Sequence, residues 1–363
     1  MRIFGLIIWL GVFCAGSICA QTPAASEVLE IKFKKLRDDI YVAYRPDTLK
    51  YWVEGNVTII INESDVVVVD ASGAPRSAQI VIAEIRRLTK KPVRYLINTH
   101  GHGDHTVGNQ EYLKAFPEIE IIAHEKTAEY ITGTGYNYVE EIAKSTESRK
   151  KEGEAEIARL AAEKKAGNAA VIENLTQYYR RDIDIRQAEY KKVKRTPPTL
   201  TLTKSLRLQR GKRVIEILHL GAGDTPGDLV VYLPQEKIIC TGDMITEPVP
   251  FGYSRFPLDW RETLSRLAQM DFETLIPGHG EIQTGKAYVR KVENLLQAVQ
   301  EQVKAEIAAG ADLDRVKKQI DLTRFENEFG GDNPVNRYYF REYFWTPNVE
   351  RTFNQLKSQE GQK

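Results

Sequence analysis

The sequence THGHGDH, residues 99–105, directly follows the apolar segment VRYLI, residues 93–97. Three of the chain's six histidines lie in this short run, together with one aspartate. Imidazole nitrogens and carboxylate oxygens are ligands that zinc, iron and similar metals bind well. The alternative is a polar turn that holds histidines by chance, but solvation alone does not explain so dense a cluster at the end of an apolar strand. We therefore predict a metal site here.

The spacing within the cluster predicts two neighbouring metal positions. Side chains of an extended segment alternate between its two faces, so His100 and His102 point to the same side and can share one metal. If the chain turns into a helix after His102, Asp104 and His105 face an adjacent position. Gly101 and Gly103 leave room for a close approach of the backbone.

The cluster and the segment TVGN after it resemble the HxHxDH motif of the metallo-β-lactamase superfamily. Further segments match that family's motifs in the right order: VVVDASG at 67–73, GAGDTPGDLVVYLP at 221–234, CTGDM at 240–244 and IPGHG at 276–280. The resemblance extends from about residue 30 to residue 300. It implies an α+β fold, a four-layer αββα sandwich, with metals in a groove at one edge of the sheets.

The resemblance also implies a set of metal ligands and a cofactor, two zinc ions. By position in the motifs, the first metal is bound by His100 and His102, the second by Asp104, His105 and His279, and Asp243 bridges the two. A hydroxide held between the metals would attack an acyl or ester carbon, because the metals lower the pKa of bound water and stabilise the oxyanion. Asp104 is the expected catalytic residue, which orients that hydroxide or handles its proton.

The third motif departs from the family pattern. Asp224 stands where the family normally has a histidine ligand, and His219, five residues earlier, is a structural residue or a substitute ligand. A carboxylate still binds zinc. Two imidazoles and one carboxylate, from His100, His102 and Asp224, also suit non-haem iron, so Fe²⁺ or Mn²⁺ is the alternative at the first position.

The first twenty residues differ from the rest of the chain. Arg2, the apolar run IFGLIIWLGVFCAG and small residues before Gln21 are typical of a secretory signal peptide, residues 1–20. The apolar run is short for a membrane span, so we expect no stable membrane insertion after cleavage and a secreted or periplasmic protein. Cleavage after Ala20 leaves 50 basic and 50 acidic residues, a balance that gives no long-range attraction to nucleic acid.

Composition divides the remaining chain. We expect a metallo-β-lactamase-like domain over residues 28–310 and a C-terminal helical extension over 311–363. Within the domain, residues 138–195 are rich in Glu, Lys, Arg and Ala and lack proline, which indicates a helical insertion broken near residues 167–168. Periodicity predicts further helices over residues 77–88, 260–270, 286–308 and around 348–356.

The sequence locates the metal site more firmly than it identifies the reaction. We expect an exported hydrolase that cleaves a small-molecule ester, lactone or β-lactam-type amide. Phe251 and Tyr253, in a loop just after Asp243, are the candidate substrate contacts, although simple packing explains them equally well. An iron-dependent oxidoreductase on the same fold and a non-catalytic binding protein with a decayed site remain as alternatives, since fold does not choose the reaction. The sequence makes no prediction of oligomeric state.

Overall fold

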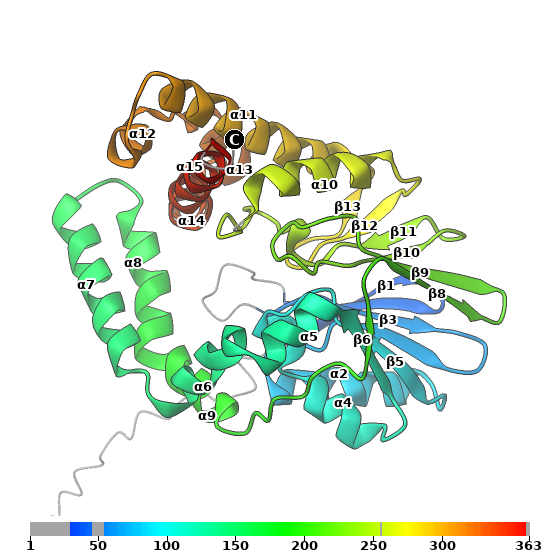
Figure 1. Ribbon diagram of the computed structural model, residues 1–363. Helices are drawn as coiled ribbons and strands as arrows, with labels where there is room; N and C mark the ends of the chain where they lie inside the picture. The colour runs from blue at the N-terminus through cyan, green and yellow to red at the C-terminus, as the bar shows by residue number, and fades with distance from the viewer. Residues whose placement is uncertain (1–29, 46–53, 255, 361–363) are drawn as a thin grey trace, which may run out of the picture.

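The computed structural model describes residues 30–45, 54–254 and 256–360. Two β-sheets lie face to face, and helices cover the outer face of each sheet (Figure 1). This arrangement is the four-layer αββα sandwich, and it confirms the predicted fold class. The predicted signal peptide, residues 1–20, lies outside the described residues. No helix within the described part of the chain has the length and apolar content that a bilayer crossing requires.

The first sheet has seven strands in the order of the sequence. Its first four strands pair antiparallel and the remaining ones pair parallel. The strands are β1 (Lys32–Arg37), β2 (Ile40–Tyr44), β3 (Val57–Ile61), β4 (Val66–Val69), β5 (Val93–Ile97), β6 (Glu120–His124) and β7 (Leu200–Leu202).

The second sheet has six strands in the order β13-β12-β11-β10-β9-β8. Only the pair β11 and β12 is parallel among its described strands. The strands are β8 (Ser205–Arg210), β9 (Arg213–Leu218), β10 (Val230–Leu233), β11 (Ile238–Cys240), β12 (Thr274–Ile276) and β13 (Gln283–Thr284).

The layers follow from the alternation of side chains along buried strands. In β4, Val67 and Val69 belong to the core between the two sheets, whereas Val66 and Val68 face the outer helices. A strand covered on both faces needs a continuous apolar run, which explains the four consecutive valines. The same division holds in β10, where Val231 faces the other sheet and Val230 faces the helices.

Helices α2 (Pro75–Leu88) and α4 (Asn109–Ala115) cover the first sheet, and α10 (Pro257–Gln269) and α11 (Ala287–Ala308) cover the second (Figure 1). The helices predicted over 77–88, 260–270 and 286–308 are therefore confirmed, with ends shifted by at most a few residues. Proline at the first position of α2 and of α10 suits a helix start, because its missing N–H has no partner there.

The insertion contains two helices that form a hairpin, α7 (Glu147–Glu163) and α8 (Asn168–Gln177). Gly167 joins them with a φ of +92°, a left-handed conformation that favours glycine. The break therefore falls where the sequence predicts it. The other helices here are α6 (Asn137–Lys144), η2 (Tyr178–Asp182) and α9 (Ile183–Tyr190), and the short helices before them are α5 (Glu125–Thr132) and η1 (Thr134–Tyr136).

The C-terminal residues are also helical. They form α12 (Leu313–Gln319), α13 (Thr323–Gly330), α14 (Pro334–Tyr339), η4 (Phe340–Trp345) and α15 (Thr346–Glu360). The helix predicted around 348–356 is part of α15. The division into a domain over 28–310 and an extension after it stays a prediction.

The insertion and the C-terminal helices contact each other although they are far apart in the sequence. The Tyr338 hydroxyl donates to Glu156 Oε1 at 3.0 Å, and the Tyr339 hydroxyl donates to Asn174 Oδ1 at 2.5 Å. Leu160, in α7, packs in a small apolar cluster with residues of α14. In Figure 1 the green hairpin and the red C-terminal helices accordingly stand side by side at one end of the sandwich.

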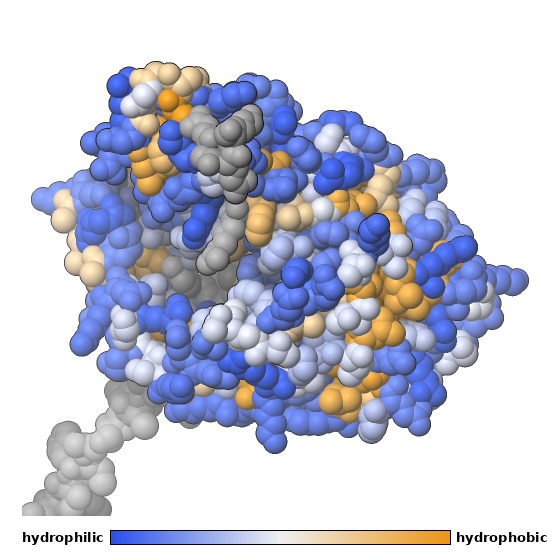
Figure 2. Space-filling model, in the orientation of Figure 1, coloured by the Kyte–Doolittle hydropathy of each residue, from blue (hydrophilic) through white to orange (hydrophobic). Residues whose placement is uncertain are grey.

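Figure 2 shows this face of the molecule to be mostly hydrophilic, with hydrophobic side chains in separate patches.

Candidate metal centre

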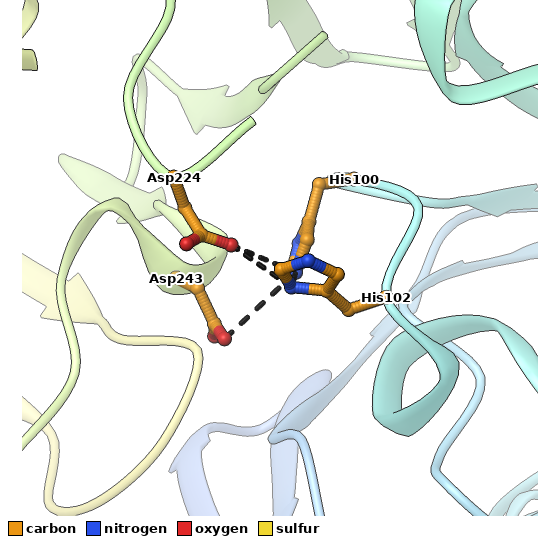
Figure 3. A group of neighbouring side chains, drawn as sticks. All are labelled: His100, His102, Asp224 and Asp243. Carbon is orange, nitrogen blue, oxygen red and sulfur yellow. Dashed lines mark hydrogen bonds and ion pairs between the residues drawn. The ribbon is translucent and has the colours of Figure 1, made fainter. Parts of the chain in front are cut away.

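The candidate ligands lie in loops and turns that follow strands at one edge of the two sheets. His100 follows β5, and His102 is the residue before the short helix α3 (Gly103–Thr106), which holds Asp104 and His105. Asp224 lies between β9 and β10, Asp243 lies in η3 (Gly242–Met244) after β11, and His279 follows β12. Figure 3 shows the two histidines on one side and Asp224 and Asp243 facing them from the other.

The first group consists of His100, His102, Asp224 and Asp243. His100 Nε2 lies 3.1 Å from His102 Nδ1, and Asp224 Oδ2 lies 2.9 Å from that same His102 nitrogen. Asp243 Oδ2 lies 3.8 Å from His100 Nε2. The four side chains thus turn one potential ligand atom each toward a common point (Figure 3).

The second group consists of Asp104, His105, Asp243 and His279. His105 Nε2 lies 3.3 Å from His279 Nε2, and His279 Nε2 lies 3.0 Å from Asp104 Oδ2. Asp243 takes part through its other oxygen, Oδ1, which lies 3.1 Å from His105 Nε2. Asp243 therefore belongs to both groups, one carboxylate oxygen to each, which is the arrangement of a bridging ligand.

These distances fit a pair of metal ions. Two nitrogens bound at about 2.0–2.1 Å to one tetrahedral zinc ion lie about 3.3–3.4 Å apart. The two imidazole pairs lie 3.1 and 3.3 Å apart. Asp224 Oδ1 is buried without a hydrogen bond in the described part of the chain, and Asp224 Oδ2 and Asp243 Oδ1 face imidazole nitrogens. Buried carboxylate oxygens need a partner, and a cation between the imidazoles would supply one.

The charges of the groups lead to the same conclusion. Burial disfavours charged imidazoles, but neighbouring carboxylates outweigh burial and raise the pKa of His102 to about 9 and the pKa of His279 to about 10. For His100, burial prevails and lowers the pKa well below its ordinary value. Without a cation, protons on the imidazoles balance the carboxylates, so metal binding has to displace protons.

The two histidines of the second group are each oriented by a contact of the other ring nitrogen. His105 Nδ1 lies 2.9 Å from Asp70 Oδ2, and His279 Nδ1 lies 3.0 Å from the backbone oxygen of Glu54. With a proton on Nδ1 in both residues, Nε2 faces the metal position with its lone pair free. Such contacts fix the tautomer and the ring orientation of a metal ligand.

Asp70 contacts the candidate ligand His105, and the sequence reasoning did not single it out. It follows β4 with a φ of +64°, and its carboxylate also accepts hydrogen bonds from the backbone N–H of Thr99, at 2.8 Å, and from the Thr99 hydroxyl, at 2.9 Å. The signal was available, because a single acidic residue directly after four valines, inside a segment that matches a family motif, has no structural need to be there.

The loop that carries His279 is held by Asn56, a second residue that the sequence did not single out. Asn56 Nδ2 donates to the backbone oxygens of Pro277, at 2.9 Å, and Gly280, at 3.0 Å. Between them, Gly278 passes so close to Asp243 that a Cβ atom on Gly278 would lie 1.9 Å from Asp243 Oδ1. Only glycine therefore allows this loop and Asp243 to meet.

The structure puts Asp224, and not His219, into the first group. His219 Nδ1 donates to the backbone oxygen of Asp228 at 2.9 Å, and its ring lies 4.4 Å from the ring of His124. His124 Nδ1 accepts from the backbone N–H of Lys126 at the start of α5. His219 and His124 thus have structural contacts, and neither is in a candidate metal group among the described residues.

Only two of the ligand side chains are exposed to solvent to any extent. His102 is 27 % exposed and Asp104 is 20 % exposed, whereas the other five ligand side chains are at most 7 % exposed. Rings of Tyr130 and Phe251 flank His102, with centroid distances of 5.8 and 6.4 Å. Tyr253 is exposed and its ring lies 5.1 Å from that of Phe251. Phe251 thus borders the access side, and its contact with substrate stays a prediction.

An αββα sandwich that carries two adjoining groups of histidines and carboxylates at the edge of its sheets is typical of one class of metal-binding proteins. The model of the metallo-beta-lactamase superfamily matches residues 51–279, and the chain belongs to this superfamily. The motif resemblance is thereby confirmed. A fold of this family implies that divalent metals bind, and the two groups are its candidate sites.

Individual relatives are distant. The linear primary-alkylsulfatase of Pseudomonas sp. (strain ATCC 19151) is 22 % identical over 306 residues, covering 77 % of this chain and 51 % of that protein. The chain thus spans about half the length of this curated relative. The sec-alkylsulfatase from Pseudomonas sp., described as stereoselective and inverting, is similar in structure with a TM-score of 0.59 and 15 % identity, over 90 % of this chain and 50 % of that one. A metallo-beta-lactamase from Pontibacter korlensis has a TM-score of 0.50 and 18 % identity, over 74 % of this chain and 99 % of that one.

Proposed function

We propose that this protein is an exported hydrolase with two metal ions, which cleaves a small-molecule ester, lactone or β-lactam-type amide. The observation that carries the proposal is the shared position of Asp243, with Oδ2 toward the first group and Oδ1 toward the second. A carboxylate that binds at both positions would join the two metals into one dinuclear centre. Both metals would then act on the same substrate.

Bound divalent metals would supply activated water and stabilisation of negative charge on the substrate. First, Asp70, Thr99 and the backbone of Glu54 hold the ligand histidines in place. Second, Asp104 presents a carboxylate at the access side. Burial raises its pKa, but His105 and His279 outweigh burial and lower it, so Asp104 stays ionised and can orient a water molecule by accepting its hydrogen bond.

Zinc at both positions is the expected cofactor, with Fe²⁺ or Mn²⁺ at the first position as the alternative. The first group contains His100, His102 and Asp224, two imidazoles and a carboxylate on one metal position, which also suits non-haem iron. Metal analysis of protein purified without added metal decides between them. Two equivalents of zinc and no iron would exclude an iron-dependent oxidoreductase.

Hydrolysis of sulfate monoesters is a second candidate function. It is supported by the alkylsulfatase similarity, which extends over 90 % of this chain, whereas the similarity to the Pontibacter korlensis β-lactamase extends over 74 %.

The test is a screen of the metal-loaded protein with β-lactam, lactone, carboxylic ester, thioester, phosphodiester and alkyl sulfate substrates. We expect Asp104→Asn to lose turnover of the substrate found, with Asp314→Asn as the matched control at an exposed aspartate of α12. Asp224→His separates a working centre from a decayed one. A working centre loses or changes its reaction, while a decayed one gains metal and activity. A protein that binds no metal would overturn the proposal.

A further inference from the structure

The insertion contains an arginine that forms no ion pair with any acidic side chain among the described residues. Arg186, in α9, makes hydrogen bonds to the hydroxyls of Tyr178, at 3.2 Å, and Tyr190, at 3.0 Å. Its Nε is buried and has no hydrogen bond, and within the described residues no carboxylate pairs with it. Two other partly buried arginines of the insertion do form ion pairs: Arg181 pairs with Asp182, and Arg195 pairs with Glu140.

An unbalanced guanidinium in such a place is costly. Burying a charge without a counter-charge removes its hydration, and proteins usually compensate with an ion pair or a bound ion. Arg186 also lies over the Tyr190 ring, 5.0 Å from its centroid, but a ring offsets only part of that cost. The residue as a whole is partly buried and not fully enclosed.

The tyrosines near Arg186 connect it to the metal motif. Tyr190 and Tyr138 lie in one cluster with Val107, the second residue after His105. The Tyr138 hydroxyl accepts the backbone N–H of Gly103 at 2.6 Å, directly beside Asp104. Helix α9, which carries Arg186 and Tyr190, packs against α6, which carries Tyr138.

The Tyr138 hydroxyl has an unused hydrogen-bond donor beside Gly103. A phenol hydroxyl carries one donor hydrogen and two acceptor lone pairs. Gly103 occupies one lone pair, and no described residue accepts the hydrogen. Gly103 lies between His102 and Asp104, which are the two ligand side chains that reach solvent.

We propose that Arg186 and the Tyr138 hydroxyl form an anion-binding subsite, which holds an anionic oxygen group of the substrate beside the metal centre. The inference rests on the proposed hydrolase function and deepens it, because it narrows the substrate to one that carries a sulfate or carboxylate group. A guanidinium has five N–H donors, of which Arg186 uses two on tyrosines, so donors remain for an oxyanion.

Binding of inorganic sulfate to the zinc-loaded protein tests the subsite directly, by isothermal titration calorimetry at constant ionic strength. We expect Arg186→Met to weaken sulfate binding tenfold or more, as the loss of a charge-assisted contact implies. Tyr138→Phe should weaken it several-fold. Arg180→Met is the matched control, because Arg180 is an exposed arginine of the same insertion, and we expect its affinity for sulfate to be that of the wild type. Acetate in place of sulfate shows which oxygen group is preferred.

A structural role for Arg186 predicts another result. If Arg186 only supports the tyrosines, Arg186→Met lowers stability but binds sulfate as well as Arg180→Met does, and that outcome overturns the proposal. Should Arg186→Met not fold, Arg186→Lys keeps the charge without the planar donor group, and we expect several-fold weaker sulfate binding; wild-type binding there overturns the proposal as well. Metal content is measured for every variant. The two proposals can fail separately. If sulfate binding depends on Arg186 but the protein hydrolyses none of the substrates, the proposed hydrolase is wrong and the anion-binding subsite is supported.

Discussion

Replacement of Asp70 by asparagine should weaken metal binding without removing a metal ligand. Asp70 is 2 % exposed and accepts contacts from His105 Nδ1 and from both the N–H and the hydroxyl of Thr99. An asparagine keeps one acceptor oxygen and turns an NH₂ group toward one of these donors. A buried donor left without an acceptor costs about 1–3 kcal/mol. Loss of a residue that orients a metal ligand typically costs about 10–100-fold in metal affinity, or about 1.4–2.7 kcal/mol.

The assay is competition for zinc with a chelator of known affinity, combined with metal analysis and the free energy of unfolding of the metal-free protein. We expect the ion held by His105 to be lost first, because only this imidazole contacts Asp70 among the described ligands. Asp314→Asn, at an exposed aspartate of α12, makes the same chemical change at the surface. If Asp70→Asn bound both ions with wild-type affinity, the role that we assign to Asp70 would be wrong.

Three other predictions follow from the described contacts. Gly278→Ala should lose both metal ions, since its Cβ would lie 1.9 Å from Asp243 Oδ1, and a full metal content by elemental analysis would contradict this. Zinc binding should release protons and strengthen as pH rises from about 6 to 9, because the pKa values of His102 and His279 are raised to about 9 and about 10 in the metal-free protein; calorimetry in buffers of different ionisation enthalpy measures the release. Burial and the neighbouring His219 lower the pKa of His124, so the folded protein binds fewer protons than the unfolded chain, and the free energy of unfolding should fall as pH drops below about 6.5. His124→Gln should show a shallower fall in denaturant titrations at pH 7 and 5, and an unchanged slope would refute this.

Much of the fold could be predicted because its signals are local. The four valines of β4 predict a strand buried on both faces, and the helical periodicity of α2, α10 and α11 places these helices to within a few residues. The cluster of residues 99–105 locates the metal site for the same reason, since its ligands are neighbours in sequence.

The parts that could not be predicted depend on contacts between distant segments. Physical reasoning alone did not connect His279 or Asp243 to residue 100, and the family resemblance was needed for both. The roles of Asp70 and Asn56 depend on how loops meet after folding, and no periodicity records that. The contact of Tyr338 with Glu156 spans 182 positions, and neither residue has an unusual sequence environment.

That last contact has a consequence for the order in which the molecule takes shape. Every candidate metal ligand precedes residue 280, whereas the α14 residues that brace the α7–α8 hairpin begin at Pro334. A chain emerging from the ribosome therefore possesses its full set of ligands dozens of residues before the brace exists. Contacts of long sequence separation form late because closing a long loop costs entropy. The hairpin should consequently be the least protected part of a nascent or truncated chain, and proteases should cut there first.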